Sequence, residues 1–337
     1  MTIKLQAVTS AVPDTLWTNR KIQELTGASP DFVEKKIGVE SRFFLGDNET
    51  GVDLSLEAVS KLLDQCNIDK NAIELLVYIT QTPDYRIPQN SALLHQRLKL
   101  PKSCASFDIS LGCSGYVYGL SVTQGLMEIQ GISNAILVTC DPYSKIMDKN
   151  DKNTMTVFGD AATASLLSNE GVFQIGKADM GTNGEFSSSL QIDHAGAKNP
   201  VLGVHRELPR TSKVEEIRLN MKGREVFNFV VSNVPNSIQN CLNKNNLEME
   251  DVTWFALHQG SKHMLDYMAS RVGIPDEKML RNLSKYGNTV SSTVPMLIEE
   301  LLDNSSLIGG NKVIISGFGV GLSWATNVLT FKPQQYK

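Results

Sequence analysis

Short, largely apolar runs alternate with segments of helical spacing along almost the whole chain, and this alternation constrains the fold more than any other feature. Apolar runs of this length predict strands that are buried on both faces. The expected strands are 75–80, 104–109, 135–139, 253–257, 312–316 and 324–331. The expected helices are 54–65, 91–98, 114–129, 224–242, 261–272 and 289–302. Strands and helices in alternation predict an α/β fold with a mostly parallel sheet covered by helices.

The order of these elements occurs twice, although the residue identities do not repeat. Each round contains a helix opened by a chemically interesting residue, Cys113 in the first and Asn288 in the second. We place the boundary near Gly171, which divides the chain into halves 1–171 and 172–337. Both opening helices begin with small residues that allow close helix packing, so we expect Cys113 and Asn288 to meet at one end of the sheet.

The composition excludes several classes of protein. The chain has 337 residues and a net charge of −4, which argues against a nucleic-acid binder. Its five cysteines form no C-x-x-C pair, a pattern typical of a reducing compartment. The first residues lack the layout of a signal peptide, and no apolar stretch approaches the length of a membrane span. A cytoplasmic protein is therefore expected.

Cys113 follows the expected strand 104–109 and precedes the expected helix 114–129. At such a position the helix dipole and the free N–H groups favour a thiolate, which is the nucleophilic form. The alternative is a small buried apolar residue, the usual use of an unpaired cysteine.

Two polar residues of the second half stand at comparable positions. His258 ends the strand 253–257, and open α/β sheets place ligands at such ends. A lone histidine is nevertheless more often structural. Asn288 can be a helix cap, for which Asn is well suited, or can offer its side-chain N–H₂ to a substrate carbonyl.

The glycine-rich segment 317–324 does not fit a dinucleotide fingerprint, because its spacing is wrong and a strand follows it. It predicts either a tight hairpin or a loop whose backbone N–H groups line an oxyanion hole. No H-E-x-x-H motif occurs, and the spacing of His258 and His263 does not suit a metal pair, so we expect no metal site.

Taken together, these segments resemble β-ketoacyl-acyl-carrier-protein synthase III, a family of thiolase-like condensing enzymes. Motifs in matching order run through nearly the full length of the chain. They are Ala11-Val12-Pro13-Asp14 with Thr18-Asn19, Ile37-Gly38-Val39-Glu40-Ser41-Arg42, Asn48-Glu49-Thr50, Phe158-Gly159-Asp160-Ala161-Ala162, His258-Gln259, Gly287-Asn288-Thr289, and Phe318-Gly319 with Trp324.

The resemblance implies a duplicated thiolase-like fold in five layers (αβαβα) and a homodimer. It implies that Cys113 takes an acyl group as a thioester, while His258 and Asn288 donate hydrogen bonds to a malonyl thioester on acyl carrier protein. Loss of CO₂ then gives an enolate that attacks the acyl group. The N–H of Cys113, with that of Val320 or Gly319, is implied as the oxyanion hole.

The chain departs from the family pattern at several implied binding positions. Phe32 and Lys152 match the tryptophan and arginine that enclose the coenzyme A adenine, and a lysine cannot stack as a guanidinium does. Ile87 matches a phenylalanine that crosses the dimer to limit the acyl pocket. Lys262 and Arg271 are the residues implied to dock the carrier protein. These departures favour a specialised paralogue over a housekeeping initiation enzyme.

The sequence is compatible with three functions. The first is decarboxylative condensation between a primer, acyl-CoA or acyl-carrier protein, and malonyl-carrier protein. The second is transfer of the acyl group from Cys113 to an alcohol or amine, in secondary metabolism or surface-polysaccharide biosynthesis. The third, a scaffold without activity, is disfavoured because a nucleophile and two donors are all present. We expect no resident cofactor, because coenzyme A and carrier protein act as substrates.

Overall fold

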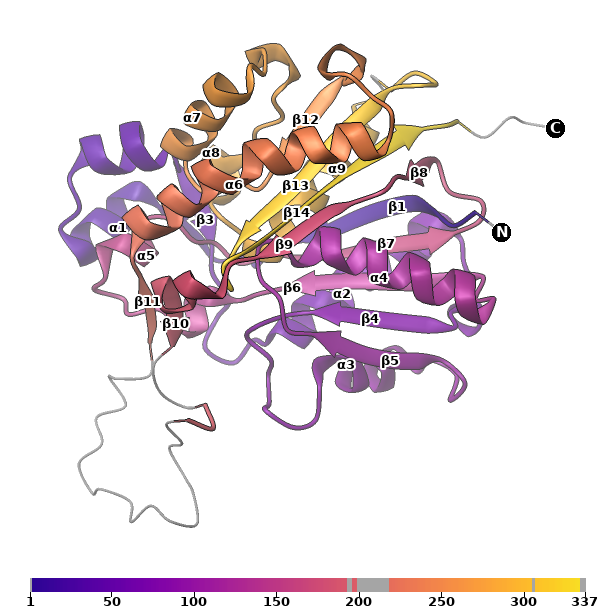
Figure 1. The fold of residues 1–337 in the computed structure, drawn as a ribbon. Coiled ribbons are helices and arrows are strands. Elements are labelled where there is room, and N and C mark those ends of the chain that lie inside the picture. Colours follow the sequence, from indigo (N-terminus) through magenta and orange to yellow (C-terminus); the bar gives the residue numbers. More distant parts are fainter. Residues whose placement is uncertain (1, 193–195, 199–217, 305–306, 334–337) are drawn as a thin grey trace.

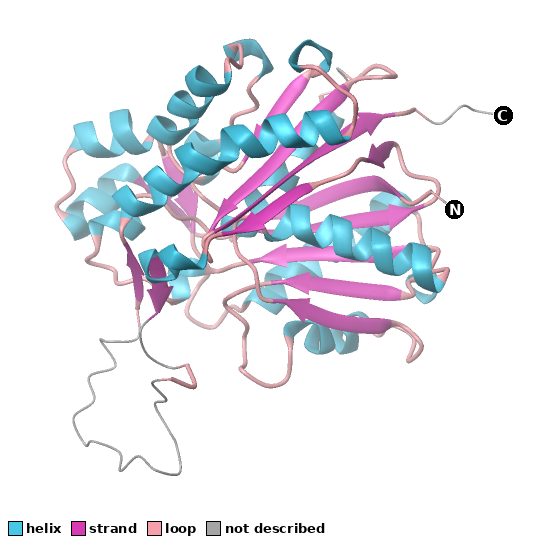
Figure 2. Ribbon diagram, viewed as in Figure 1, coloured by secondary structure: helices cyan, strands magenta, loops and turns pink. Residues whose placement is uncertain are grey.

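Ten strands form one twisted sheet with helices on both faces (Figures 1 and 2). The computed structural model describes residues 2–192, 196–198, 218–304 and 307–333. The strands of the large sheet are β1 (Lys4–Ala11), β4 (Leu75–Ile79), β5 (Ala105–Ile109), β6 (Asn134–Cys140), β7 (Ala162–Ser168), β8 (Phe173–Ile175), β9 (Asp179–Thr182), β12 (Trp254–Leu257), β13 (Lys312–Gly319) and β14 (Ser323–Phe331). Two small antiparallel pairs stand apart, β2 (Leu16–Thr18) with β3 (Ser41–Phe43) and β10 (Leu190–Ile192) with β11 (Leu219–Met221).

The helices occupy the segments that the periodicity indicated, together with three further short ones. They are α1 (Asn19–Thr26), α2 (Gly51–Cys66), α3 (Asn90–Leu98), α4 (Gly115–Gln130), α5 (Lys152–Met155), α6 (Gly223–Lys244), α7 (Lys262–Val272), α8 (Leu283–Tyr286) and α9 (Thr293–Asp303). No helix within these described ranges has the length and apolar character needed to cross a bilayer.

The sheet runs in the order β12-β13-β14-β8-β1-β7-β6-β4-β5, with β9 added beside β14. The ladders β4–β5, β4–β6 and β12–β13 are parallel, and the other ladders of this sheet are antiparallel. The expectation of a mostly parallel sheet was therefore wrong. The α/β alternation reveals strands that are joined by helices, whereas β1, β7, β8 and β9 were not recognised and pair in the antiparallel sense.

The two halves of the chain pair their strands in the same way. In the first half β4 lies between parallel neighbours β5 and β6, and β7 and β1 then follow in antiparallel order. In the second half β12 lies between a parallel bridge to Met279 and the parallel strand β13, and β14 and β9 follow in antiparallel order. The repeated order seen in the sequence thus corresponds to a repeated ladder.

The strands of each half form one β layer of the continuous sheet. With the helices they make five layers, in agreement with the expected thiolase-like fold. α4 and α9 contact strands of both halves and form the middle layer. α2 and α3 cover the strands of the first half, whereas α6, with α7 beside it, covers those of the second. α4 has glycine at the two positions that face Ile79. A β-carbon at Gly115 or at Gly119 would lie 2.5 Å from the side chain of Ile79. The middle layer can therefore approach the strand that precedes the site.

β8 joins the two sets of strands into one sheet. Phe173 pairs with Leu5 of β1 on one side and with Phe331 of β14 on the other. The rings of Phe173 and Phe331 also meet edge to face, with centroids 5.4 Å apart. The proposed boundary at Gly171 stays a prediction, because the strand that follows it belongs to the ladders of both halves.

Candidate active site

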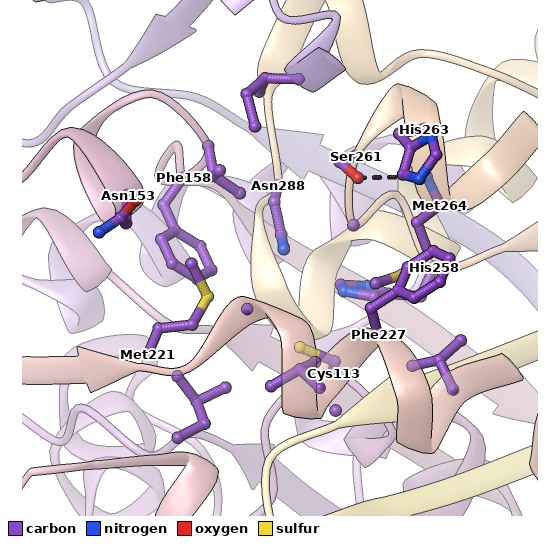
Figure 3. Close-up of a pocket in the computed structure, with 18 of the residues that line it drawn as sticks. Cys113, Asn153, Phe158, Met221, Phe227, His258, Ser261, His263, Met264 and Asn288 are labelled. Carbon is purple, nitrogen blue, oxygen red and sulfur yellow. Dashed lines mark hydrogen bonds between the residues drawn. The ribbon is translucent and has the colours of Figure 1, made fainter. Parts of the chain in front are cut away.

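A cavity of about 500 Å³ opens where the two halves meet, and Cys113, His258 and Asn288 all line it (Figure 3). Cys113 comes from the first half, whereas the other two come from the second. Much of the remaining wall is apolar, formed by residues such as Phe158, Met221, Phe227, Met264 and Phe318. The three chemical groups therefore share one largely apolar cavity, and Cys113 and Asn288 meet as the sequence predicted.

Cys113 lies between β5 and α4, two residues before the helix begins. Its side chain is buried, with 4% of its surface exposed. A β-carbon at Gly317 would overlap the carbonyl oxygen of Cys113, so only glycine lets β13 pass this close. The glycine-rich segment is thus the hairpin of β13 and β14, and it is packed directly against Cys113.

The burial of Cys113 favours its thiol form, whereas the helix terminus alone was expected to favour a thiolate. Burial and, to a lesser extent, the nearby carboxyl group of Asp141 raise the pKa of Cys113 to about 12. Hydrogen bonds from the backbone N–H groups of Cys113 and Val320 to the sulfur act in the opposite direction but are outweighed. Desolvation disfavours the charged form more than the helix terminus favours it.

His258 follows β12 and is held as a neutral ring. Its backbone N–H donates to the carbonyl of Ser316, 2.8 Å away, which continues the ladder with β13. Its ring meets Phe318 edge to face, with centroids 5.4 Å apart. Burial lowers the pKa of His258 to about 3, so the imidazole carries one proton at neutral pH. Nδ1 lies 2.7 Å from Oγ1 of Thr293.

Asn288 is fixed by both its backbone and its side chain. Its N–H donates to the carbonyl of Val157 at 2.9 Å, and its carbonyl accepts the N–H of Gly159 at 3.0 Å. Its Oδ1 accepts the backbone N–H of Val290 at 2.9 Å. The amide nitrogen is therefore the end that faces the cavity (Figure 3).

The helix that Asn288 was expected to open begins later. A single 3₁₀ turn, Val290–Ser292, intervenes, and α9 begins at Thr293. Val290 has φ of 55°, a left-handed conformation that is rare for a β-branched residue. That conformation interrupts the helix and turns the N–H of Val290 back to the side chain of Asn288.

Buried hydroxyl groups tie the two halves together around the cavity. The hydroxyls of Ser114 and Ser323 are 2.8 Å apart. Ser291 donates to the carboxylate of Asp141 at 2.5 Å. The other oxygen of Asp141 accepts the N–H of Gln81 at 2.7 Å, which fixes the loop after β4. Burial raises the pKa of Asp141 to about 6, so this carboxylate is ionised at neutral pH.

Of the three residues predicted to bind coenzyme A or the acyl group, one lines the cavity and two do not. Phe32 lies in a π-helical turn, Phe32–Ile37, and lines the cavity. Lys152 is exposed at the start of α5, and it is the adjacent Asn153 that lines the cavity. Ile87 is 88% exposed and does not line the cavity.

The predicted docking residues lie on α7, and the predicted oxyanion residues lie beside Cys113. Lys262 and Arg271 are both exposed on α7, and Lys262 forms an ion pair with Asp266 at 2.6 Å. Val320 directs its N–H at the sulfur of Cys113, whereas Gly319 provides the close approach of the backbone. Within the described part of the chain, no three His, Cys, Asp or Glu groups are placed to hold a metal ion.

Sequence reasoning missed Asp141, Ser291 and Thr293 as parts of the site. It interpreted the polar run after Asn288 as small residues that permit helix packing. Their partners lie 150 positions away for Ser291 and 35 for Thr293. No local pattern reports contacts of that range.

Comparison with known proteins gives consistent matches. Residues 107–184 match the family model described as 3-oxoacyl-[acyl-carrier-protein (ACP)] synthase III, and residues 242–331 match the model of its C-terminal part. The β-ketoacyl-[acyl-carrier-protein] synthase III of Lactococcus lactis subsp. cremoris is 30% identical over 329 residues, which cover 97% of this chain and 98% of that protein. The enzyme of the same name from Clostridium perfringens is 31% identical and covers 94% of this chain and 95% of its own length.

Solved structures agree with these matches. A crystal structure of a 3-oxoacyl-(acyl-carrier-protein) synthase III has a TM-score of 0.90 at 32% identity and covers 98% of this chain and 100% of its own. A 3-oxoacyl-(acyl-carrier protein) synthase from Burkholderia xenovorans LB400 has a TM-score of 0.87 at 31% identity and covers 99% of this chain and 95% of its own.

Proposed function

The chain belongs to the β-ketoacyl-[acyl-carrier-protein] synthase III family of acyl-transferring condensing enzymes, and we propose that it joins an acyl group held on Cys113 to a malonyl unit on acyl carrier protein. The observation that carries this proposal is the convergence of one thiol and two neutral donors, His258 and Asn288, in one cavity.

In the first half-reaction the sulfur of Cys113 attacks the carbonyl of an acyl thioester. The bond from that carbonyl to the carrier sulfur breaks, and the thiol proton of Cys113 ends on the departing carrier thiol. The backbone N–H groups of Cys113 and Val320 are placed to stabilise the oxyanion formed in between. Splitting the condensation in this way holds the acyl group in place for the second substrate.

In the second half-reaction His258 and Asn288 donate hydrogen bonds to the thioester carbonyl of the malonyl group. The bond between its methylene carbon and its carboxylate breaks, CO₂ leaves, and the electron pair remains as an enolate. The methylene carbon then attacks the acyl carbonyl on Cys113, the thioester bond to Cys113 breaks, and the departing sulfur takes up one proton from solvent to restore the thiol. Donors placed where negative charge develops can each contribute about 3–4 kcal/mol to catalysis.

The partners and setting are part of the same proposal. Acyl carrier protein delivers the malonyl group, and the exposed cations Lys262 and Arg271 on α7 suit an acidic partner. A homodimer is supported by the exposed apolar loop of Tyr85 and Ile87, which are 60% and 88% exposed. We propose a cytoplasmic enzyme without a resident cofactor, with five unpaired cysteines.

The test combines a panel of acyl-CoA and acyl-carrier thioesters with malonyl-carrier protein. Intact-protein mass should show an acyl group on Cys113, absent from Cys113→Ala, and its mass identifies the primer. CO₂ release should fall at least about 100-fold in Asn288→Ala and His258→Ala, since each removes a donor to developing charge. CO₂ release independent of both residues would overturn the proposal, and an ester or amide product without malonyl would establish the acyltransferase alternative.

A further inference from the structure

We propose that Thr293 is a positioning residue for His258: its hydroxyl group holds the imidazole in the tautomer that carries its proton on Nε2. This inference rests on the proposed function, in which His258 acts as a hydrogen-bond donor. It assigns a role to a residue that touches neither the cavity nor the reacting atoms.

The hydroxyl of Thr293 has one hydrogen and two neighbouring acceptors. Nδ1 of His258 is 2.7 Å from Oγ1, and the carbonyl oxygen of Val290 is 3.1 Å from it. A hydroxyl can donate to only one of them at a time. Thr293 and His258 are 1% and 3% exposed, so bulk water does not compete for these contacts. Hydroxyl donors make shorter hydrogen bonds than N–H donors, so the 2.7 Å contact favours donation from Thr293 to the imidazole.

The direction of that hydrogen bond decides what the other ring nitrogen can do. A neutral imidazole carries one proton, and burial keeps the pKa of His258 near 3. If Thr293 donates to Nδ1, the proton of the ring is on Nε2, and His258 can donate to a carbonyl oxygen. If Thr293 donates to Val290 instead, the proton is on Nδ1 and a bare Nε2 would repel that oxygen.

Val290 connects the two donors of the site. Its N–H binds Oδ1 of Asn288 and so turns the amide nitrogen of Asn288 to the cavity. Its carbonyl oxygen is the competing acceptor for Thr293. Because Val290 is held in a left-handed conformation, one short turn fixes the orientation of Asn288 and offers the alternative partner that would reverse His258.

The first experiment compares Thr293→Val, which keeps the shape but removes the hydroxyl, with Thr293→Ser, which keeps the hydroxyl. Thr293→Val should slow malonyl decarboxylation by about 10- to 100-fold, within the range for loss of one aligned donor. Acylation of Cys113, which needs no donor from His258, should change by less than about threefold in the same variant. Thr293→Ser should restore decarboxylation.

The second experiment reads the tautomer directly and does not depend on activity. Nitrogen-15 NMR of histidine-labelled protein should show a protonated Nε2 and an unprotonated Nδ1 for His258, with the signals assigned by loss in His258→Asn. A proton on Nδ1 in the wild-type protein would overturn the inference, as would full decarboxylation by Thr293→Val. A wild-type protein that lacks decarboxylation but shows the Nε2 proton would refute the proposed function alone.

Discussion

The sulfur of Cys113 and the backbone of Gly319 are so close that a β-carbon at position 319 would lie 2.8 Å from Sγ. Such a carbon would also lie 3.0 Å from the β-carbon of Cys113. Real β-carbons almost never make contacts this short, so either the hairpin or the cysteine would have to move.

Gly319→Ala should therefore lower condensation by about 100-fold, the cost of displacing a reactive group by about 1 Å. Steady-state turnover and acylation of Cys113 measured by intact mass would both report the loss. Gly125→Ala is the matched control, because nothing lies within 4 Å of its β-carbon in the interior of α4. That variant should gain about 0.5–1 kcal/mol of stability and keep its activity. Equal activity of the two variants would contradict the role assigned to Gly319.

The raised pKa of Cys113 predicts how its reactivity depends on pH. Below a pKa of about 12 the thiolate fraction rises about tenfold per pH unit, so alkylation by iodoacetamide should accelerate steadily from pH 6 to pH 9. Peptide mass mapping would separate Cys113 from the half-buried Cys66. A plateau below pH 8 would show that the thiol is already ionised.

Asp141→Asn should raise the alkylation rate of Cys113 at a given pH, because the ionised carboxyl group of Asp141 raises the pKa of the thiol. Several-fold acceleration is expected, with the same slope against pH. The variant should also lose about 1–3 kcal/mol of stability, because an amide cannot replace every hydrogen bond that the buried carboxylate accepts. An unchanged alkylation rate in a folded variant would contradict the coupling.

The lowered pKa of His258 predicts a loss of stability in acid. The unfolded chain binds a proton near pH 6.5, whereas the folded chain binds it only near pH 3. This contribution is complete above pH 6.5 and falls by at most about 1.4 kcal/mol per pH unit below it. Between pH 7 and pH 4, wild-type protein should lose about 2–3 kcal/mol more than His258→Asn in denaturant titrations. Parallel curves of stability against pH for the two proteins would contradict the lowered pKa of His258. Comparing the two proteins cancels the opposite contributions of Asp141 and Asp160, whose pKa values burial raises to about 6.

The exposed loop at Ile87 predicts self-association through an apolar tip. Ile87→Asp should shift the protein towards the monomer in sedimentation or light-scattering measurements, because a charge would be buried on association. Ile129→Asp is a matched control, since Ile129 is 80% exposed on α4. An identical mass for both variants and the wild-type protein would place any interface elsewhere.

Much of the fold could be predicted from the sequence because its central strands are buried on both faces. β4 is buried at all five positions, so its residues form an uninterrupted apolar run. By contrast, β9 alternates between half-buried and exposed residues and is only four residues long, so it gives no comparable signal. Apart from the β13–β14 hairpin, each antiparallel ladder of the large sheet involves β1, β7, β8 or β9, which were not recognised.

The chemical groups of the site were predictable, but their surroundings were not. Cys113, His258 and Asn288 each follow or precede a recognisable element, and their positions were predicted correctly. The pKa of Cys113 was not, because the helix terminus is visible in sequence and burial beside Asp141 is not. Thr293 was likewise missed as a partner of His258, because the contact joins residues on separate elements.

The interface between the two halves of the chain determines how damage to this enzyme would be detected. Cys113 belongs to one half and His258 and Asn288 belong to the other, with Ser114 and Ser323 hydrogen-bonded directly between the halves. A small displacement of one half relative to the other separates these three side chains long before it exposes either core to water. Turnover therefore reports the relative position of the two halves more sensitively than a melting temperature does. A slightly misaligned molecule would be inactive while still fully folded.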